Sequence, residues 1–355
     1  MDNAALNRYK DNLLNNLYFR KEYDESSGLK KKILLVEGAT DKKFIDRIKT
    51  RDMRCISVAE FVQARNAFST RQPSASVSHK EIIVEILKHL SRYPEMFDFP
   101  KGAEMWPLYG MVDNDFDESQ QFAPITKLFF TDTHDLETLL IWSDESLLMR
   151  LDNCVISKEE INRALYLAGQ FSKFRQAVYK VCCGDNDLPI SVLNTSDGTV
   201  NFSAFTENDK ISLSRLMDYA NQNLGSEKLS PARIKKLTDK VSVELKKYID
   251  RNGVWKKDIS SFTAKSDDYW LFVNGHDILS AMRFVSANAN TEFCVSGGFV
   301  QNRGFEFVLI EKYAIPCFAK TKLYEKLFSA ELIICCERMG GDCPLAGASS
   351  VPAEC

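Results

Sequence analysis

Residues 31–41 read KKILLVEGATD, and this stretch decides the fold. The run ILLV at 33–36 is short, aliphatic and uninterrupted, which is typical of a strand whose two faces are both covered. It leads directly into Glu37 and Gly38, and a second acidic residue, Asp41, follows one helical turn later. Carboxylates this close together at the end of a buried strand repel each other, so we expect partners for them elsewhere in the chain.

The segment after this strand predicts a helix over 40–49 (TDKKFIDRIK). Its residues Phe44, Ile45 and Ile48 fall on one helical face, and charged residues fall on the other. We expect Thr40 to cap the first turn. Strand, turn and helix together form the first β-turn-α unit.

The alternation of strands and helices continues along the chain. An amphipathic helix at 5–19 precedes the first strand, and the later predicted elements are a strand at 54–58, an exposed loop at 69–78, a helix at 79–92, a strand at 106–115 and a strand at 127–130. Such alternation predicts parallel crossovers and a sheet that is covered on both faces. In sheets of this type, ligands bind at the carboxyl ends of the strands.

Acidic residues follow both the first and the third predicted strand. Glu37 ends the first strand, and Asp113 and Asp115 end the third. Residues i and i+2 of an extended segment point to the same side, so we expect the two aspartates to reach one place. A divalent cation offsets the repulsion between converging carboxylates, and oxygen ligands of this kind suit Mg²⁺ or Mn²⁺.

Composition narrows the class of protein. The chain has 355 residues, 45% hydrophobic and 27% charged, as expected for a globular protein of one large or two modest domains. It has no apolar run of about 18 residues and no secretory signal pattern, so we expect a cytoplasmic protein with no membrane partner. Its ten cysteines form no CxxC pair and only four histidines are present, which disfavours a zinc site.

The C-terminal half has a mainly helical pattern, with predicted helices at 158–182, 211–223, 231–250 and 277–286. The segment 231–257 begins on a proline and carries nine lysines or arginines. We predict that Lys235, Lys236 and Lys240 contact a nucleic-acid backbone, because lysine neutralises phosphates without reading sequence. A solvated helix face is the alternative, and the net charge of −3 neither indicates nor excludes a nucleic-acid binder. The buried stripe of this helix is predicted to be Ile234, Leu237, Val241 and Leu245.

The motifs LVEG at 35–38 and VDNDFD at 112–117 resemble the two signature motifs of the TOPRIM domain of topoisomerases, primases, OLD-family nucleases and small RNA-maturing nucleases. With THDLET at 133–138, their order is more narrowly similar to the TOPRIM-like DUF4435 group. That group includes the nuclease effector of the PARIS anti-phage systems. The resemblance covers residues 30–145 and continues weakly through NGHDIL at 274–279.

The resemblance implies an α/β fold, with a Rossmann-like parallel-sheet TOPRIM domain and a mainly α-helical C-terminal domain. The expected divisions are an N-terminal helix within 1–29, the TOPRIM domain at 30–145, the helical domain at 146–337 and a flexible tail at 338–355. The resemblance also implies a catalytic set of Glu37, Asp41, Asp113, Asp115 and Glu137, of which the first four are the ligands of one or two Mg²⁺ or Mn²⁺ ions.

The function implied by the resemblance is metal-dependent hydrolysis of phosphodiester bonds in nucleic acid, with structured RNA such as tRNA as the expected substrate. The implied setting is anti-phage defence beside an ABC-type ATPase, and the chain itself has no GxxxxGK[ST] motif. One alternative is an OLD-like DNA endonuclease or nickase. Another is a noncatalytic metal-binding module that assembles with an ATPase. A homodimer also remains open.

Several residues keep two interpretations. Glu137 is either a site acid or a surface glutamate that stabilises a helix N-terminus. His134 is either a substrate contact or a residue of a helix-capping region. Asp117 points to the same side as Asp113 and Asp115 only if the strand continues that far. Asp277 is either part of a segment that closes over the site or a helix cap. Lys42 and Lys43, on the same predicted helix, either contact phosphate or are simply exposed to solvent.

Overall fold

The computed structural model describes a large part of the chain, and the bounds below refer to that part. The described residues are 7–8, 10–13, 32–67, 78–92, 108–115, 125, 127–150, 157–183, 200–208, 210–222, 228–247, 259, 262, 264, 267–288 and 302–334. Of the predicted helix at 5–19, residues 7–8 and 10–13 are described and are helical. The predicted loop at 69–78 and tail at 338–355 lie almost entirely outside the described residues.

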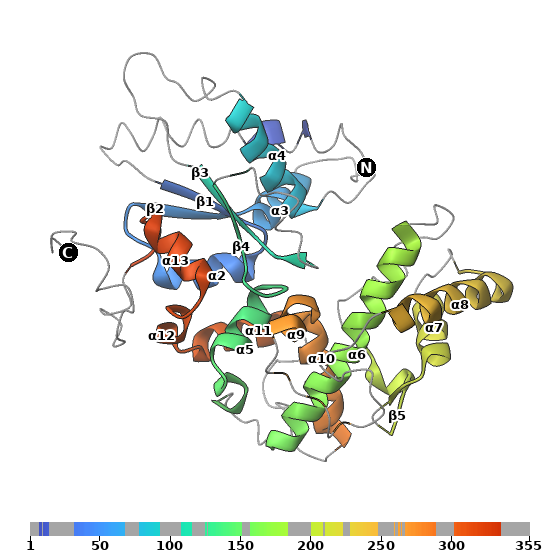
Figure 1. Ribbon diagram of the computed structural model, residues 1–355. Helices are drawn as coiled ribbons and strands as arrows, with labels where there is room; N and C mark the ends of the chain where they lie inside the picture. The colour runs from blue at the N-terminus through green and yellow to red at the C-terminus, as the bar shows by residue number, and fades with distance from the viewer. Residues whose placement is uncertain are drawn as a thin grey trace. The chain divides into compact units, whose positions relative to one another are not determined.

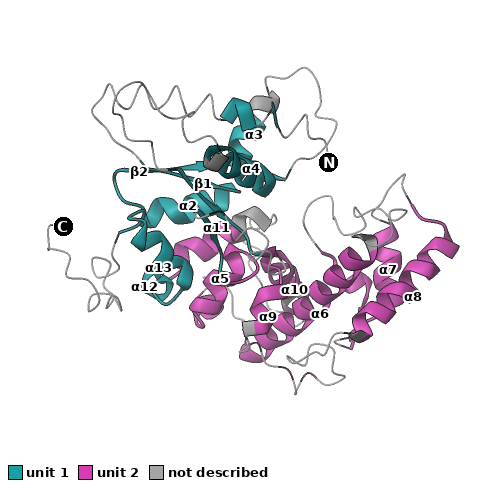
Figure 2. Cartoon of the chain, turned by 45° about the horizontal axis from the view of Figure 1, so that its top comes forward, with its two compact units in different colours: residues 1–114, 118–132, 314–355 teal, residues 115–117, 133–313 magenta. Residues whose placement is uncertain are grey.

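The chain divides into two compact units, which Figure 2 shows in different colours. Unit 1 comprises residues 1–114, 118–132 and 314–355, and unit 2 comprises residues 115–117 and 133–313. The predicted domains have different boundaries, because residues 133–145 fall in unit 2 and the described part of 314–337 falls in unit 1.

Unit 1 contains a four-stranded parallel sheet in the order β2-β1-β3-β4. Its strands are β1 (Lys32–Val36), β2 (Met53–Ser57), β3 (Leu108–Val112) and β4 (Leu128–Phe130). Val36 pairs with Ser57 on one side and with Met111 on the other, so the carboxyl ends of these strands lie at one edge. The predicted α/β fold with a parallel sheet is therefore confirmed at this level.

Helices cover both faces of this sheet. The helices of unit 1 are α2 (Ala39–Ile48), α3 (Val58–Ala67), α4 (His79–Arg92), α12 (Ile315–Phe318) and α13 (Lys322–Ser329). In Figure 1, α3 and α4 lie on one side of the strands and α2 and α13 lie on the other. The segment after α13 joins this unit through backbone bonds, from Thr50 N to Leu332 O at 3.0 Å and from Ile334 N to Ile48 O at 2.8 Å.

Three details differ from the sequence-based expectations for this unit. The third strand ends at Val112, so it is shorter than the predicted 106–115. The N-cap of α2 is Gly38, and Thr40 lies inside the helix instead of capping it. The helix α3 was not expected, because its apolar and polar residues (VAEFVQARNA) follow no clear helical periodicity.

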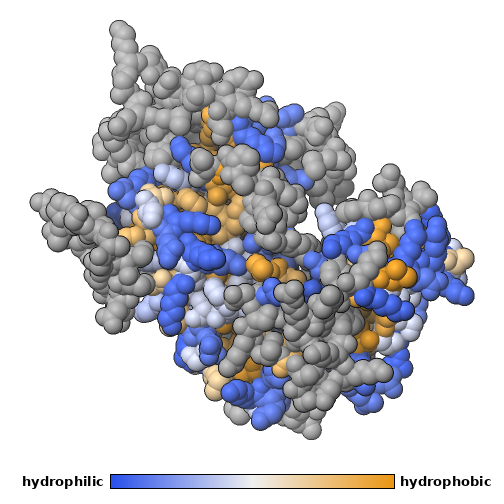
Figure 3. All heavy atoms as spheres, viewed as in Figure 1, coloured by the Kyte–Doolittle hydropathy of each residue, from blue (hydrophilic) through white to orange (hydrophobic). Residues whose placement is uncertain are grey.

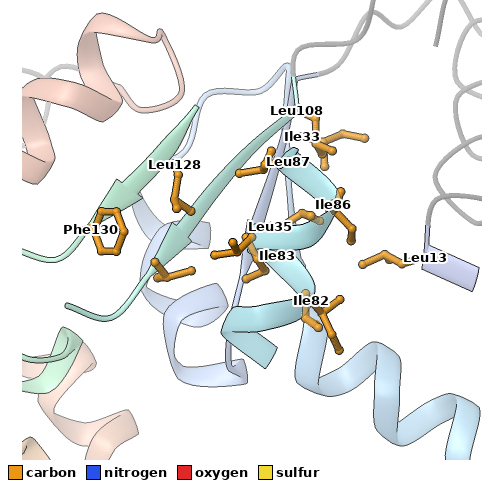
Figure 4. Packing of buried hydrophobic residues seen from close by; sticks show 13 residues of the cluster. Leu13, Ile33, Leu35, Ile82, Ile83, Ile86, Leu87, Leu108, Leu128 and Phe130 are labelled. Atoms are coloured by element: carbon orange, nitrogen blue, oxygen red, sulfur yellow. The ribbon is translucent and has the colours of Figure 1, made fainter. Parts of the chain in front are cut away.

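The hydrophobic core of unit 1 lies between the sheet and α4 (Figure 4). Aliphatic side chains of α4, including Ile83 and Leu87, pack against the strand residues Leu35 and Leu108. Gly110 of β3 lies under this helix, and an added Cβ there would approach Ile83 Cγ2 to 2.6 Å and Leu87 Cδ1 to 2.9 Å. The absence of a side chain at residue 110 thus sets how closely α4 packs on the sheet.

Unit 2 is mainly helical, as the sequence predicts. Its helices are α5 (Leu136–Ser143), α6 (Lys158–Cys183), α7 (Leu213–Gln222), α8 (Pro231–Lys247), α9 (Asp267–Phe272), α10 (Gly275–Asn288) and α11 (Asn302–Lys312), with short 3-10 turns η3 (Leu147–Arg150) and η5 (Phe202–Ala204). The strands β5 (Thr206–Glu207) and β6 (Lys210–Ile211) form a small antiparallel pair. Stacked and tilted rings of Phe171, Phe202 and Phe205 form part of its core.

No described helix is long and apolar enough to cross a membrane.

We predict that Gly110→Ala destabilises the protein by about 1–3 kcal/mol, because the new methyl group overpacks the contact between α4 and β3. Urea denaturation followed by circular dichroism measures this change in the free energy of unfolding. Gly38→Ala is the control, since the atom nearest to an added Cβ there is Asp41 Oδ2 at 3.4 Å and the φ of −118° suits any residue. An equal loss in both variants would contradict the packing explanation.

Candidate carboxylate site

Two of the predicted acids meet at the carboxyl edge of the sheet. The strands β1 and β3 are neighbours in parallel register, and Glu37 and Asp113 are the residues that follow them. Glu37 Oε1 accepts a hydrogen bond from the backbone amide of Asp113 at 2.9 Å. The structure therefore brings together the ends of the two sequence motifs, EG and DND, through a bond from a side chain to the backbone.

Asp41 has a local role at the start of α2. Its Oδ2 accepts a hydrogen bond from the Gly38 amide at 2.8 Å, and 9% of the residue is exposed. The carboxylate thereby satisfies a backbone donor at the N-terminus of α2, where negative charge is favoured. This bond explains why Thr40 is not needed as the cap.

The DND segment does not continue the β-strand. The backbone amide of Thr131 donates to Val112 O at 3.2 Å, and the Asn114 amide donates to Thr131 Oγ1 at 3.1 Å instead of to a strand. The predicted strand at 106–115 ends at Val112, so Asp113 and Asp115 lie beyond the strand from which we expected them to point to one side. Asp113 falls in unit 1 and Asp115 in unit 2. Asp117 lies outside the described residues.

Lys80 is a buried residue of this edge that sequence reasoning missed. It lies in the first turn of α4, is 7% exposed, and donates from Nζ to the backbone oxygen of Asp113 at 2.7 Å. Its ammonium also lies 6.0 Å from the centre of the Phe130 ring. A signal was present, because helices in parallel βαβ units begin near the ligand-binding edge of the sheet.

A second polar group lies within unit 2, around Asp135. Asp135 is the N-cap of α5, and its Oδ1 accepts from the Thr138 amide at 2.9 Å. Its Oδ2 accepts from the Gly275 amide at 2.8 Å and lies 3.3 Å from His134 Nδ1. The same His134 nitrogen is 3.7 Å from Asp115 Oδ1. The sequence left His134 as either a substrate contact or a residue of a capping region, and Asp135 was not identified as the cap.

Gly275 is required by the close approach of α10 to α5. A Cβ at this position would lie 2.5 Å from Glu137 Cβ and 2.8 Å from Asp135 Oδ1. Glu137, in the first turn of α5, is 8% exposed and is therefore not a surface residue. Asp277 is not a cap: it is fully buried, accepts from Ser172 Oγ at 2.9 Å, and adds to the acidic character of this region.

Burial and neighbouring charges shift the pKa values of His134, Asp135 and Asp277. Burial lowers the pKa of the His134 imidazole, but the hydrogen bond and charge of Asp135 outweigh burial and leave this pKa above its usual value. Burial raises the pKa of Asp135, while His134 and two backbone amides lower it, and the net pKa lies below its usual value. Burial also raises the pKa of Asp277, although Arg175 at 3.1 Å opposes this shift.

His276 and Glu306 form a further ion pair within unit 2. His276 Nδ1 lies 3.1 Å from Glu306 Oε1, and the Glu306 residue is 6% exposed. Burial opposes protonation of His276, but the Glu306 hydrogen bond and the charge of Glu137 outweigh it and raise the pKa of His276 to about 10. The imidazole is therefore charged at neutral pH.

The carboxylates fit a hard divalent cation in their chemistry but do not form a complete ligand cluster. Among the residues that the structure describes, no group of three or more His, Cys, Asp or Glu side chains is placed to hold a metal ion. Glu37 and Asp41 each use one oxygen for a backbone amide.

The predicted basic surface is on α8 of unit 2. Lys235 and Lys236 are exposed and Lys240 is half-buried, while Leu237 and Val241 are fully buried. The other two residues of the predicted stripe, Ile234 and Leu245, are half-buried. The helix thus has an apolar face and a lysine-bearing face, and Figure 3 shows hydrophilic residues over α8.

No protein-family model, curated protein or solved structure matches the chain.

We predict that the stabilising effect of His276 depends on pH. A histidine whose folded pKa is raised stabilises the fold below its unfolded pKa of 6.5, and this contribution is lost as pH rises through about 10. The difference in unfolding free energy between wild type and His276→Gln is expected to be greatest below pH 6.5 and to shrink toward pH 10. Urea titrations at several pH values measure it.

The control for this prediction is Glu306→Gln, which removes the partner of the imidazole. In that background the pH dependence contributed by His276 is expected to be smaller, because its shortest ion pair is gone. An energy difference between wild type and His276→Gln that stays constant from pH 6 to pH 10 would contradict the assignment.

Proposed function

We propose that the protein is a metal-dependent nuclease that hydrolyses phosphodiester bonds, with Mg²⁺ or Mn²⁺ as the cofactor and structured RNA as the preferred substrate. The observation that carries the proposal is the bond from the Asp113 amide to Glu37 Oε1 at the carboxyl edge of a parallel sheet. This edge is where open α/β sheets bind their ligands. The bond brings the end of the EG motif against the start of the DND motif.

In this proposal, each acid at the edge has a defined part. Glu37, Asp41 and Asp113 of unit 1 would hold the metal, and the motif resemblance implies Asp115 as a further ligand. When bound, the metal stabilises charge on the phosphate and lowers the pKa of water. Glu37 is oriented by its bond to the Asp113 amide, and Lys80 fixes the backbone oxygen of Asp113. Glu137 remains a proposed site acid, supported by its burial in the first turn of α5.

The biological setting of the proposal rests on the motif resemblance. TOPRIM identity, the role in anti-phage defence and the ABC-type ATPase partner are what the resemblance carried by LVEG, VDNDFD and THDLET implies. An OLD-like DNA endonuclease uses the same acids, so the test below includes both kinds of nucleic acid. A noncatalytic metal-binding module is the second candidate, and the observation that favours it is that Glu37 and Asp41 each accept a hydrogen bond from a backbone amide, which is a structural role.

We predict that Glu37→Gln reduces nuclease activity at least 100-fold while leaving the fold intact. The amide side chain keeps an oxygen that accepts from the Asp113 amide, but it loses the charge that a divalent cation needs. Purified protein is incubated with total tRNA and with plasmid DNA in Mn²⁺, and cleavage rates are compared. Glu60→Gln is the control, because Glu60 is an exposed acid of α3 that pairs with Lys42.

The same samples separate the rival functions. Cleavage of tRNA and not of plasmid supports the proposed substrate, and the reverse result supports the DNA endonuclease. A wild type that is stabilised by Mn²⁺ in a thermal melt but cleaves neither substrate supports the noncatalytic module. Full activity in a folded Glu37→Gln variant would remove the carboxylate assignment altogether.

We predict that α8 contributes to backbone binding through Lys235, Lys236 and Lys240. Replacing all three by Gln is expected to weaken binding to unrelated sequences. The log–log salt dependence should flatten by about 0.7–0.9 per lost contact. Fluorescence anisotropy at a series of salt concentrations measures both quantities. Cleavage at saturating substrate is expected to approach the wild-type rate, because these lysines are not metal ligands.

The control for α8 replaces three exposed lysines of unit 1, Lys320, Lys322 and Lys326, by Gln. Both triple variants change the net charge equally, so a long-range charge effect alone would flatten both salt slopes alike. An unchanged slope in the α8 variant would mean that its lysines are only the solvated side of a helix.

A further inference from the structure

We propose that unit 2 has a binding pocket for a small organic cation with a flat apolar body, such as a protonated or quaternary aromatic amine. The pocket has a volume of about 780 Å³ and is lined by residues of α5, η3, α6, α9 and the segment that contains Phe262. All of these residues belong to unit 2. The lining includes none of the proposed metal ligands, so the inference does not depend on the nuclease function.

The lining is mostly apolar and includes three aromatic side chains. Trp142 comes from α5, Trp270 from α9, and Phe262 from the segment before α9. Trp270 and Phe262 are buried, and Trp142 is half-buried. Small-molecule sites in proteins are typically pockets of about 300–1,000 Å³ with apolar and aromatic walls and a few polar groups. The pocket fits this description in both its size and its lining.

The aromatic part of the lining is held in place by Tyr269, which is itself fully buried. The Tyr269 hydroxyl donates to Leu165 O at 2.6 Å, and its ring packs edge-on against Phe262 at 5.5 Å and Trp270 at 4.9 Å between centroids. The backbone oxygen of Trp270 also accepts a hydrogen bond from the His134 amide at 2.8 Å. A wall held by several contacts needs little rearrangement when a ligand binds, so the entropy cost of binding is low.

The charged residues of the lining favour a cation. They are Glu145, Lys158 and Glu159, and all three are exposed. Two carboxylates and one ammonium group give the lining a net negative charge at neutral pH. The faces of tryptophan and phenylalanine rings also attract cations, because the ring quadrupole is negative there. Both features have the same sign, and charge complementarity therefore selects a positively charged ligand.

A nucleobase is the main alternative occupant, because bases stack on aromatic side chains. A nucleotide brings at least one phosphate, however, and Glu145 and Glu159 would repel it. Proteins that bind single strands combine their stacking rings with a positively charged groove. Here the lining has two acids and one lysine, so its charges favour an amine over a nucleotide.

Probes that share one ring system test the sign of the preferred charge. They are (2-naphthylmethyl)trimethylammonium, 2-naphthylmethanol and 2-naphthalenesulfonate, and adenosine monophosphate is added as a nucleotide probe. We expect the cation to bind about 10-fold more tightly than the neutral alcohol, and the sulfonate to bind more weakly than the alcohol. Isothermal titration calorimetry of the full chain, without metal or nucleic acid, measures the dissociation constants.

Variants of the exposed charges test whether the cation binds at this pocket. Glu145→Gln combined with Glu159→Gln is expected to weaken cation binding about 3- to 10-fold and to leave binding of the alcohol unchanged. Lys158→Gln should strengthen cation binding, because it removes a like charge. The matched control combines Asp218→Asn with Asp239→Asn, which replaces two exposed acids of α7 and α8 outside the lining. It changes the net charge equally and is expected to leave cation binding unchanged.

The aromatic contribution is tested at Trp142, which is half-buried. Trp142→Leu keeps an apolar side chain but removes the ring, so it should weaken binding of the cation more than binding of the alcohol. A thermal melt without probe reports on the fold of this variant. In wild type, the indole N–H signals of Trp142 and Trp270 are expected to shift in nuclear magnetic resonance spectra when the cation is added. Constant signals from all four tryptophans of the chain during cation binding would overturn the inference.

The remaining outcomes either support the pocket or overturn it. Equal dissociation constants for the cation, the alcohol and the sulfonate would overturn the inference, and so would a wild type that does not bind the cation. Tighter binding of adenosine monophosphate than of the cation would overturn it in favour of a nucleic-acid contact. Cation binding that changes equally in the pocket variant and the matched control would mean that the probe binds elsewhere. None of these results bears on the nuclease proposal, which Glu37→Gln tests separately.

Discussion

The parallel pairing of β1 with β3 is the constraint on which the candidate site depends. This pairing aligns the two carboxyl ends, so that Glu37 reaches the amide of Asp113 at 2.9 Å. In the same sheet, α4 packs closely on β3, which the missing side chain of Gly110 permits. The same close packing brings the first turn of α4, with Lys80, to the backbone oxygen of Asp113. The packing of α4 over Gly110 and the bond from Lys80 to Asp113 thus both depend on where α4 lies on the sheet.

The elements that could be predicted from the sequence are those with strong local signals. The run ILLV predicts a covered strand, and α4 and α6 have enough periodic apolar residues to be recognised as helices. The membership of 314–334 in unit 1 could not be predicted, because it depends on bonds between residues that are far apart in sequence, such as Thr50 N to Leu332 O. Periodicity carries no information about such pairs.

The candidate site shows the same division between local and distant signals. The positions of Glu37 and Asp113 follow from a general rule for parallel sheets, which needs only the strands and their order. Lys80 and Asp135 were missed because they act on backbone atoms: a carbonyl oxygen in one case and two amides in the other. Asp135 did carry a recognisable signal, because an Asp directly before a predicted helix is a preferred N-cap, whereas the residue type of Lys80 does not indicate its carbonyl partner.

The carboxylates of this protein combine a structural bond with the capacity for chemistry. An acid that caps a helix or accepts a strand-end amide is held in one orientation, and its charge is stabilised by the same donor. Asp41 and Glu37 are held in this way in unit 1, and Asp135 is held by two amides in unit 2. Such bonds remove the entropy that a free side chain would lose when it binds a cation. The structural role of an acid and a role in metal binding are therefore compatible, and only a direct measurement of metal affinity distinguishes a prepared ligand from a simple cap.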